Sequence, residues 1–464
     1  MITTTTDTIA LRKLGIPWAD LPKTFQDAIE VGRYLSIRYL WIDSLCIVQD
    51  DRNDWQQESA QMAHIYENAY LVIAATQALD STIGCFSMRS PSQLMGSTPF
   101  YEHTTASNEI VPIYLRFPKR VHHHFSPHTT FNMSADHEVP LLSRAWVLQE
   151  RLLGTRVVHF CQGDLIWECR ERTLCECMEL DEVLMSSMKK LFRNQIQRQD
   201  QESRLFLWHK ILKLYSSLSI TIPSDLLPSL TGIVNQMQAA GAGDYLAGLW
   251  KNTLLPDLLW YTYRMNENRP ARWRAPSWSW ASLNGGYSHK LSQDNSPDLV
   301  LGHVKLEALK SPECVSTQKR LPTILLEARV DTAGPGGEIA YCHLILSAPV
   351  IDVQIVPGRR GRWRMLREGC SEEFEHDCDA DFVGAYMKGA GYLCMWVGTV
   401  WEKGEMFPQL LVLRNSIGVS GTPATTGAYE RVGILSYGRV GNLSSKKDVM
   451  DWFKDAISKP IKLV

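Results

Sequence analysis

Residues 40–50 read Leu40-Trp41-Ile42-Asp43-Ser44-Leu45-Cys46-Ile47-Val48-Gln49-Asp50. The apolar run at residues 39–42 predicts a short strand, and Asp43 follows directly where that strand ends. Asp54 then provides a cap for a helix expected from residue 55 to about 68. Open α/β sheets bind ligands beyond the carboxyl ends of their strands, so Asp43 is a candidate site residue. The alternative is that Asp43 only caps the loop after it, through backbone N–H groups.

Helix and strand signals continue to alternate on both sides of this stretch. Thr24 is a plausible N-cap for a preceding helix, and Gly154 is a good terminator for a later one. A long insertion at about 79–138 contains one convincing strand, at 111–115. Such alternation with short links predicts an α/β fold, a helix-flanked and mostly parallel sheet within residues 1–180. The other expected elements are helices at 24–35 and 143–153 and strands at 70–75, 156–160 and 165–169.

The rest of the chain changes character twice. Residues 195–290 are predicted to be a helical segment, with Leu205, Trp208, Leu212 and Tyr215 at helical spacing. Residues 291–464 form a β-rich carboxyl-terminal region, expected as an antiparallel sheet or small barrel-like module that ends in a helix at about 445–457. Its expected strands are 323–330, 343–346, 351–356, 392–397, 409–413 and 432–436.

Composition excludes several classes of partner. The 464 residues carry a net charge of −2, with 48 Lys and Arg against 50 Asp and Glu, so no global attraction for nucleic acid follows. We find no run of about 18 apolar residues and therefore expect no membrane span. The amino terminus lacks the features of a secretory signal, and the 11 cysteines are an odd number, so we expect a cytoplasmic protein with reduced thiols.

Glu58 is the most unusual single residue of the expected helix at 55–68. It falls on the same stripe as Trp55 and Met62, at apolar positions that should face inward. A carboxylate in such a stripe must be paired or neutralised, and a raised pKa there would suit acid–base catalysis. The alternative is a structural hydrogen bond or salt bridge, with Arg144 as a partner.

Arg144, Trp146, Gln149 and Glu150 cluster at the start of the later helix. The last three share a face by their i, i+3 and i+4 spacing. One interpretation is a polar binding cluster that faces Asp43 and Glu58 across the rim of the sheet. The other is a buried network between helices, and the sequence alone does not separate the two.

No metal or cofactor site is predicted. Cys161, Cys169, Cys175 and Cys177 follow a spacing unlike the paired cysteines of structural zinc sites, so we interpret them as scattered thiols. The chain contains neither a G-x-G-x-x-G after a strand nor a Walker A sequence, and hence no phosphate-binding loop.

Three blocks of sequence together resemble the fungal heterokaryon-incompatibility (HET) domain family. They are residues 21–28 with 39–50, residues 54–58 with Met62 and 65–69, and Ser143-Arg144-Ala145-Trp146-Val147-Leu148-Gln149-Glu150-Arg151. Later segments at 224–228, 247–250 and 275–280 are similar to the region that often follows this domain. The family's domain normally begins with a strand reading like Tyr-x-x-Leu-Ser-Tyr-x-Trp-Gly, which is missing here, so the resemblance implies an amino-terminally incomplete domain.

The resemblance implies a role in vegetative incompatibility, with self/non-self recognition, regulated fungal cell death, and a protein partner or self-assembly through the HET domain. The family is thought to be distantly similar to TIR domains, some of which cleave NAD with a helix glutamate. That analogy implies an NAD-glycohydrolase-type enzyme as an alternative, with NAD as substrate and Glu58 and Asp43 as catalytic residues. A third alternative is a diverged accessory protein of a metabolic gene cluster.

Overall fold

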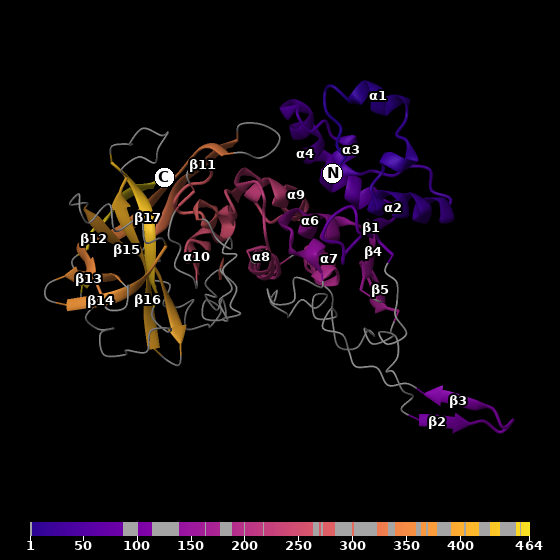
Figure 1. Cartoon of the computed structure of the whole chain (residues 1–464). Coiled ribbons are helices and arrows are strands. Elements are labelled where there is room, and N and C mark those ends of the chain that lie inside the picture. Colours follow the sequence, from indigo (N-terminus) through magenta and orange to yellow (C-terminus); the bar gives the residue numbers. More distant parts are fainter. Residues whose placement is uncertain are drawn as a thin grey trace. The chain divides into compact units, whose positions relative to one another are not determined.

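The computed structural model describes most of the chain, and all statements below concern these residues. They are 2–86, 101–113, 139–162, 164–176, 188–198, 200–216, 218–262, 269–270, 272–283, 299–300, 323–332, 339–358, 363–367, 370–377, 391–402, 405–416, 427–436, 452–454 and 456–464. The chain folds into two compact units (Figure 1). The first comprises Met1–Arg198 with Leu218–Ile220 and Ser229–Ile233, and the second comprises the remainder.

The first unit contains the helices and the small sheet expected for the amino-terminal region. Its helices are α1 (Ile9–Leu14), α2 (Lys23–Tyr34), α3 (Asp43–Cys46), α4 (Arg52–Asn68), α6 (Ala145–Leu153) and α7 (Met188–Gln197). Its strands are β1 (Val72–Ala74), β4 (Arg156–Cys161), β5 (Asp164–Cys169) and β6 (Thr173–Cys175), with a separate hairpin of β2 (Tyr101–Thr104) and β3 (Ile110–Ile113). The helices predicted at 55–68 and 143–153 are therefore confirmed, and so are the strands at 156–160 and 165–169.

The prediction of a mostly parallel sheet is wrong for the described strands. In the order β1-β4-β5-β6, only β1 and β4 run parallel, and the other two pairings are antiparallel. The reason is the connection between β4 and β5, where Cys161 pairs with Asp164. A link this short makes a hairpin, whereas a parallel crossover needs a dozen or more residues.

Two further expectations for this region need correction. Residues 39–42 do not form a strand, and Tyr39 is 85% exposed. The strand expected at 70–75 is shorter, because β1 covers Val72–Ala74 and Tyr70 is exposed. A strand needs a neighbour for its N–H and C=O groups, and in the described sheet β1 pairs only with β4.

The helix caps also differ from the prediction. α4 begins three residues early, and its N-cap is Asp51, whose carboxylate accepts hydrogen bonds from the backbone N–H groups of Asn53 and Asp54. Asp54 itself accepts from the N–H of Val48 at 2.7 Å. Thr24 lies inside α2, where its hydroxyl accepts a hydrogen bond from the N–H of Gly84. Both predicted caps thus hold loops rather than the starts of their helices. Gly154 does end α6, as predicted.

The second unit begins with helices and ends with strands. α8 (Gln201–Tyr215) buries Trp208, Leu212 and Tyr215, which confirms the predicted inward face. It is followed by α9 (Thr231–Ala239), whose first turn belongs to the first unit, by the hairpin β7 (Tyr245–Leu246) and β8 (Leu249–Trp250), and by α10 (Leu254–Asp257). A short pair, β9 (Tyr261–Thr262) and β10 (Leu299–Val300), comes next.

The β-rich carboxyl-terminal region is confirmed, and its antiparallel strands close on themselves (Figure 1). The strands are β11 (Ile324–Thr332), β12 (Ile339–Pro357), β13 (Trp363–Arg367), β14 (Cys370–His376), β15 (Tyr392–Glu402), β16 (Glu405–Asn415), β17 (Ala428–Ser436) and β18 (Ser458–Leu463). The hydrogen-bonded order β12-β13-β14-β17-β16-β15 returns to β12. In addition, β11 pairs with β12, and β18 pairs with both β12 and β17. Side chains such as Ile351, Met365 and Val412 fill the interior. The helix predicted at 445–457 lies almost wholly outside the described residues.

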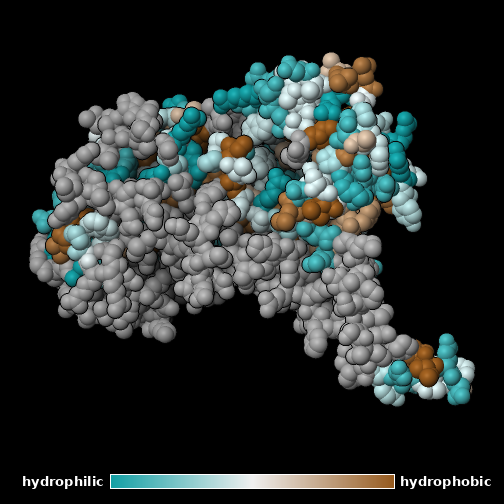
Figure 2. All heavy atoms as spheres, viewed as in Figure 1, coloured by the Kyte–Doolittle hydropathy of each residue, from teal (hydrophilic) through white to brown (hydrophobic). Residues whose placement is uncertain are grey.

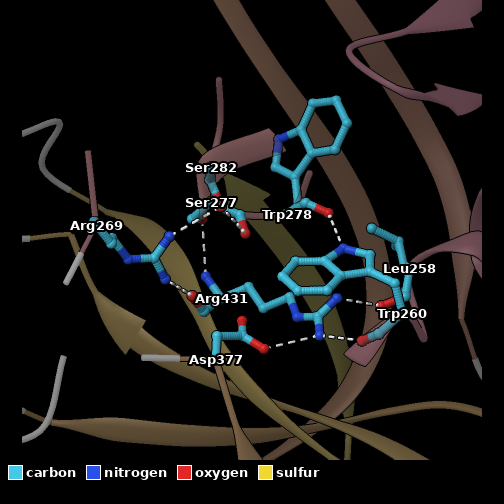
Figure 3. A network of polar contacts seen from close by, with 8 residues as sticks. All are labelled: Leu258, Trp260, Arg269, Ser277, Trp278, Ser282, Asp377 and Arg431. Carbon is cyan, nitrogen blue, oxygen red and sulfur yellow. Dashed lines mark hydrogen bonds and ion pairs between the residues drawn. The ribbon is translucent and has the colours of Figure 1, made fainter. Parts of the chain in front are cut away.

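A buried arginine fixes the strands of the second unit to its helical part (Figure 3). The guanidinium of Arg431, on β17, lies 3.4 Å from the ring centroid of Trp260. It donates hydrogen bonds to the backbone carbonyls of Leu258 and Trp260, and it pairs with Asp377 at 3.0 Å. The backbone N–H of Arg431 donates to the hydroxyl of Ser277. The network therefore ties together segments that are 54 to 173 residues apart along the chain.

Candidate functional site

Two helices of the first unit bring together a pair of titratable side chains, Tyr66 and Glu150, whose pKa values are both raised. Tyr66 lies near the end of α4, and Glu150 lies near the end of α6. The Tyr66 hydroxyl and the Glu150 carboxylate lie close enough for each to shift the pKa of the other, with the phenol as donor. Both residues are only partly exposed, so this polar contact is shielded from bulk water without being sealed from it.

The surroundings of Glu150 disfavour its charge. Burial of the carboxylate, followed by repulsion from the negative charge of Asp43, raises the pKa of Glu150 to about 7. The cation of Arg144 and the hydrogen bond from Tyr66 act in the opposite direction but do not cancel the rise. Glu150 is therefore a carboxylic acid that exchanges its proton near neutral pH, as a general acid–base residue must.

Tyr66 is affected by the same charges. Burial is the largest reason that its pKa lies well above the ordinary value, and the charges of Glu150 and Asp43 add to it. The phenol therefore stays protonated and remains a hydrogen-bond donor toward Glu150. Its ring packs edge-on against Trp41, with the ring centroids 5.7 Å apart.

Asp43 and Arg144 supply the two exposed charges of the cluster. Asp43 is the first residue of α3, and its carboxylate accepts a hydrogen bond from the backbone N–H of Ser44 at 2.7 Å. This bond is the local role that the sequence left open for Asp43. The charge of Asp43 also raises the pKa of Glu150 and of Tyr66. Asp43 can therefore form its local hydrogen bond and still act on the site. Arg144 stands at the N-cap position of α6, from where its charge reaches the same two groups.

The remaining candidates from the sequence lie in different places. Trp146 is half-buried and packs edge-on against Trp55 on α4, with centroids 6.5 Å apart. Glu58 is also half-buried on α4, and among the described residues its side chain makes no hydrogen bond or ion pair. Gln149 is buried and turns toward α9, where its carbonyl accepts from the N–H of Gly232. Trp146 and Glu150 thus face α4, and Gln149 does not share that contact.

Sequence reasoning gave Tyr66 no role, although a signal for it existed. Tyr66 lies four residues after Met62 and eleven after Trp55, so it continues the inward stripe that drew attention to Glu58. Extending the stripe to the end of the helix would have predicted that the Tyr66 phenol faces inward, as Trp55 and Met62 do. The contact with α6 could not be read from the sequence, because more than 80 residues separate the two.

A second polar cluster holds α6 against the sheet. The guanidinium of Arg151, on α6, binds Glu168, on β5, through Nε at 2.7 Å and through a second nitrogen at 3.0 Å. His159, on β4, places its Nε2 3.4 Å from the same carboxylate and its Nδ1 2.9 Å from the Thr76 hydroxyl. Lys189, on α7, donates to the backbone carbonyl of Gly154 at 2.7 Å.

The charge states of this cluster follow from its burial. Burial alone would raise the pKa of Glu168, but the charges of Arg151 and Lys189 and the contact with His159 hold it well below its ordinary value. Burial lowers the pKa of His159 to about 4 and that of Lys189 to about 8. At neutral pH the cluster therefore contains an ionised Glu168 and a neutral His159. Its side chains are almost fully buried, so it serves to position α6 rather than to meet a ligand.

No three His, Cys, Asp or Glu side chains of the described ranges lie close enough to share a metal ion. Cys161 and Cys175 are buried and form no disulfide, whereas Cys177 lies outside the described residues. None of the described helices combines the length and the apolar composition that crossing a membrane requires.

Comparison with known proteins identifies the part of the chain that contains the site. Residues 2–150 match the family model described as Heterokaryon incompatibility protein (HET). Searches of curated proteins and of solved structures found no match. The matched range includes Asp43, Tyr66, Arg144 and Glu150. This segment, about a third of the chain, is therefore the part that is similar to the HET domain of the heterokaryon incompatibility family.

Proposed function

We propose that this protein acts in heterokaryon incompatibility, where recognition of non-self triggers regulated death of the fungal cell through the HET domain. The observation that carries the proposal is the family match over residues 2–150. The match supports an incompatibility-related function in general. Cell death and self/non-self recognition are the specific form that we propose.

We further propose that assembly with a protein partner or with a second copy activates the domain. Apolar side chains stand exposed on and after the first two helices, where Leu14 is 87% exposed, Tyr34 89% and Tyr39 85%. Figure 2 shows hydrophobic side chains at the surface of the first unit around α1. Exposed apolar groups gathered in one segment support an interaction surface, since contiguous exposed apolar patches often serve binding.

The proposal is tested by inducible expression in a filamentous fungal host. The parent chain should arrest growth and kill the cells, and Glu150→Gln, expressed at the same level, should do so much less. Glu67→Gln is the control, because it alters a half-exposed glutamate of α4 whose partner is Arg170, away from Glu150. Normal growth with the parent protein at verified levels would overturn the proposal.

A second candidate function is hydrolysis of NAD, and the raised pKa of Glu150 favours it. The cluster combines an acid–base carboxyl group, a second carboxylate at Asp43 and a cation at Arg144. These are groups that could activate water, stabilise a positively charged sugar and bind a phosphate. In this candidate, Glu150 takes the acid–base role that the sequence assigned to Glu58, because the pKa of Glu150 is raised to about 7.

The reaction would proceed as follows. Ionised Glu150 takes a proton from water while the water oxygen bonds to C1′ of the nicotinamide ribose. The bond between C1′ and the ring nitrogen breaks, its electron pair goes to the pyridinium ring, and neutral nicotinamide leaves. Asp43 stabilises the positive charge that develops on the ribose. Because the base must be ionised, the rate should rise with pH through about 7.

Incubation of purified protein with NAD, followed by chromatography of nicotinamide, tests this candidate. Glu150→Gln should reduce the rate by 100-fold or more, on the order expected for loss of a general base. Glu58→Gln should cleave at nearly the parent rate. Absence of nicotinamide release from folded parent protein across pH 6 to 9, or equal rates for the parent and Glu150→Gln, would rule out the candidate.

A further inference from the structure

Gly232 lies in the first turn of α9, where this turn contacts α4 and α6. A Cβ atom added at Gly232 would lie 2.4 Å from Cβ of Ala63 on α4. It would also lie 2.8 Å from Cδ1 of Leu153 and 2.8 Å from Oε1 of Gln149, both on α6. Only glycine leaves room for such an approach, so the space that α4 and α6 occupy around α9 depends on this residue.

The side chain of Gln149 fills the junction. It is 1% exposed, and its Oε1 accepts a hydrogen bond from the backbone N–H of Gly232 at 2.6 Å. The first N–H groups of a helix have no acceptor within the helix itself. α6 therefore supplies an acceptor that the start of α9 requires, and a buried N–H left without one would cost free energy.

The beginning of α6 is held by a second backbone contact. The N–H of Ala145 donates to the carbonyl of Ser219 at 2.8 Å, and the N–H of Ser219 donates to the carbonyl of Ser143 at 2.7 Å. These bonds flank Arg144. With Gln149 bound to Gly232, α6 is attached at both its first and its middle turn.

The junction adjoins the contact between Tyr66 and Glu150. Tyr66 follows Ala63 by three residues on α4, and residues three apart are neighbours on a helix surface. Glu150 follows Gln149 directly on α6. The approach of α4 and α6 at Gly232 therefore lies within one helical turn of Tyr66 and next to Glu150.

We propose that Gln149 is a positioning residue, which binds the N–H of Gly232 and so holds Glu150 against Tyr66 and near Asp43. Its importance in the cell rests on the proposed function of the HET domain. The positioning itself is independent of that function, because it is a property of the protein without any substrate.

The experiment is a pH titration of the Glu150 carboxyl carbon by NMR, in full-length protein labelled at the glutamate carboxyl groups. The Glu150→Gln variant assigns the signal. Gln149→Met removes the acceptor while keeping the length of the side chain. Gln149→Glu keeps an acceptor, which the N-terminus of α9 favours even when charged. Gln61→Met, at an exposed glutamine of α4, is the matched control.

The proposal predicts that Gln149→Met lowers the titration midpoint of Glu150 by about one pH unit or more, because burial and the proximity of Asp43 both decrease. Gln149→Glu should keep the midpoint at or above that of the parent, and Gln61→Met should leave it unchanged. Gly232→Ala should lower it as well, since the added Cβ forces the helices apart.

An unchanged midpoint in folded Gln149→Met, or an equal fall in Gln149→Met and Gln149→Glu, would overturn the proposal. If Gln149→Met does not fold, Gln149→Asn, whose shorter side chain does not reach Gly232, takes its place with the same expectation. Failure of the fungal killing assay with an intact shift in Gln149→Met would reject the proposed function but not the positioning.

Discussion

Glu150 is set apart from the other glutamates of the first unit by its neighbours. Burial and the charge of Asp43 act on it together, while Arg144 and Tyr66 offset them only in part. The sequence placed Arg144 and Glu150 at one helix start and left two interpretations open, of which one was a cluster that faces Asp43 and Glu58. It could not rank Glu150 above Glu58, because that ranking depends on which side chains of α4 and α6 meet.

The pKa of Glu150 predicts how stability depends on pH. Its folded value, about 7, lies above the ordinary 4.5, so the folded protein binds the proton more tightly than the unfolded chain between these values. The stabilisation is fully present below about pH 4.5 and is lost as pH rises through 7. Glu150→Gln removes the ionisation, so it should gain up to about 3 kcal/mol relative to the parent between pH 5 and pH 8.

Urea unfolding of the parent and of Glu150→Gln at pH 5 and at pH 8 measures this difference. Glu67→Gln, whose side chain is half-exposed, serves as the control and should show the same difference at both values. A gap between parent and Glu150→Gln that is independent of pH would contradict the assigned shift.

At the scale of elements, α6 is held on two sides. Gln149 binds the first turn of α9, and Arg151 binds Glu168 on β5. Glu168 could have been found from the sequence, because alternate residues of a strand share a face and Ile166, two residues earlier, is fully buried. The sequence could not identify the groups that act on Glu168. Arg151, which binds it, and Lys189, whose charge acts on it, lie on helices that precede and follow β5 in the sequence.

The sheet of the first unit was only partly predictable, because the sequence indicates where strands lie more directly than how they pair. Strand positions follow from local apolar runs, and those at 156–160 and 165–169 are confirmed. Direction follows from connections, and the short link between β4 and β5 should have predicted a hairpin. Residues 39–42 have the composition of a strand but do not form one. A strand needs hydrogen-bonding partners from distant residues, and a local pattern does not specify them.

Removal of Arg151 should reveal how strongly α6 is attached. Arg151→Met leaves the buried Glu168 carboxylate without its bidentate partner and should lower the free energy of unfolding by about 3–5 kcal/mol. Arg193→Met is the control, because its pair with Glu171 is exposed and should change stability by less than about 1 kcal/mol. Denaturant unfolding of both variants measures the effect, and equal losses would show that the buried pair contributes no more than an exposed one.

At the scale of the whole molecule, the chain forms two units whose segments interleave in sequence. Ser219 and Gly232 belong to the first unit although α8 and most of α9 belong to the second. Such interleaving could not be predicted, since it depends on contacts between residues that are far apart in the sequence. In the second unit, Arg431 joins the closed strands to Trp260 and Asp377, so the helical segment and the β-rich region of that unit share a buried network.

That network predicts a large effect from one substitution. Arg431→Met leaves Asp377 without its 3.0 Å ion pair and removes the hydrogen bonds to the carbonyls of Leu258 and Trp260. The second unit should lose about 3–5 kcal/mol of stability, seen as an earlier unfolding transition in urea. Arg329→Met, at an exposed arginine of β11, should leave that transition within about 0.5 kcal/mol of the parent. Equal behaviour of the two variants would contradict the importance of the network.

The central claim is that burial, followed by repulsion from the charge of Asp43, raises the pKa of Glu150 to about 7. Titration of the Glu150 carboxyl carbon in the parent and in Asp43→Asn tests it most directly. We predict a midpoint near pH 7 in the parent and a clearly lower midpoint in Asp43→Asn, where the repelling charge is gone. A parent midpoint near 4.5, or no change on removal of Asp43, would contradict the claim.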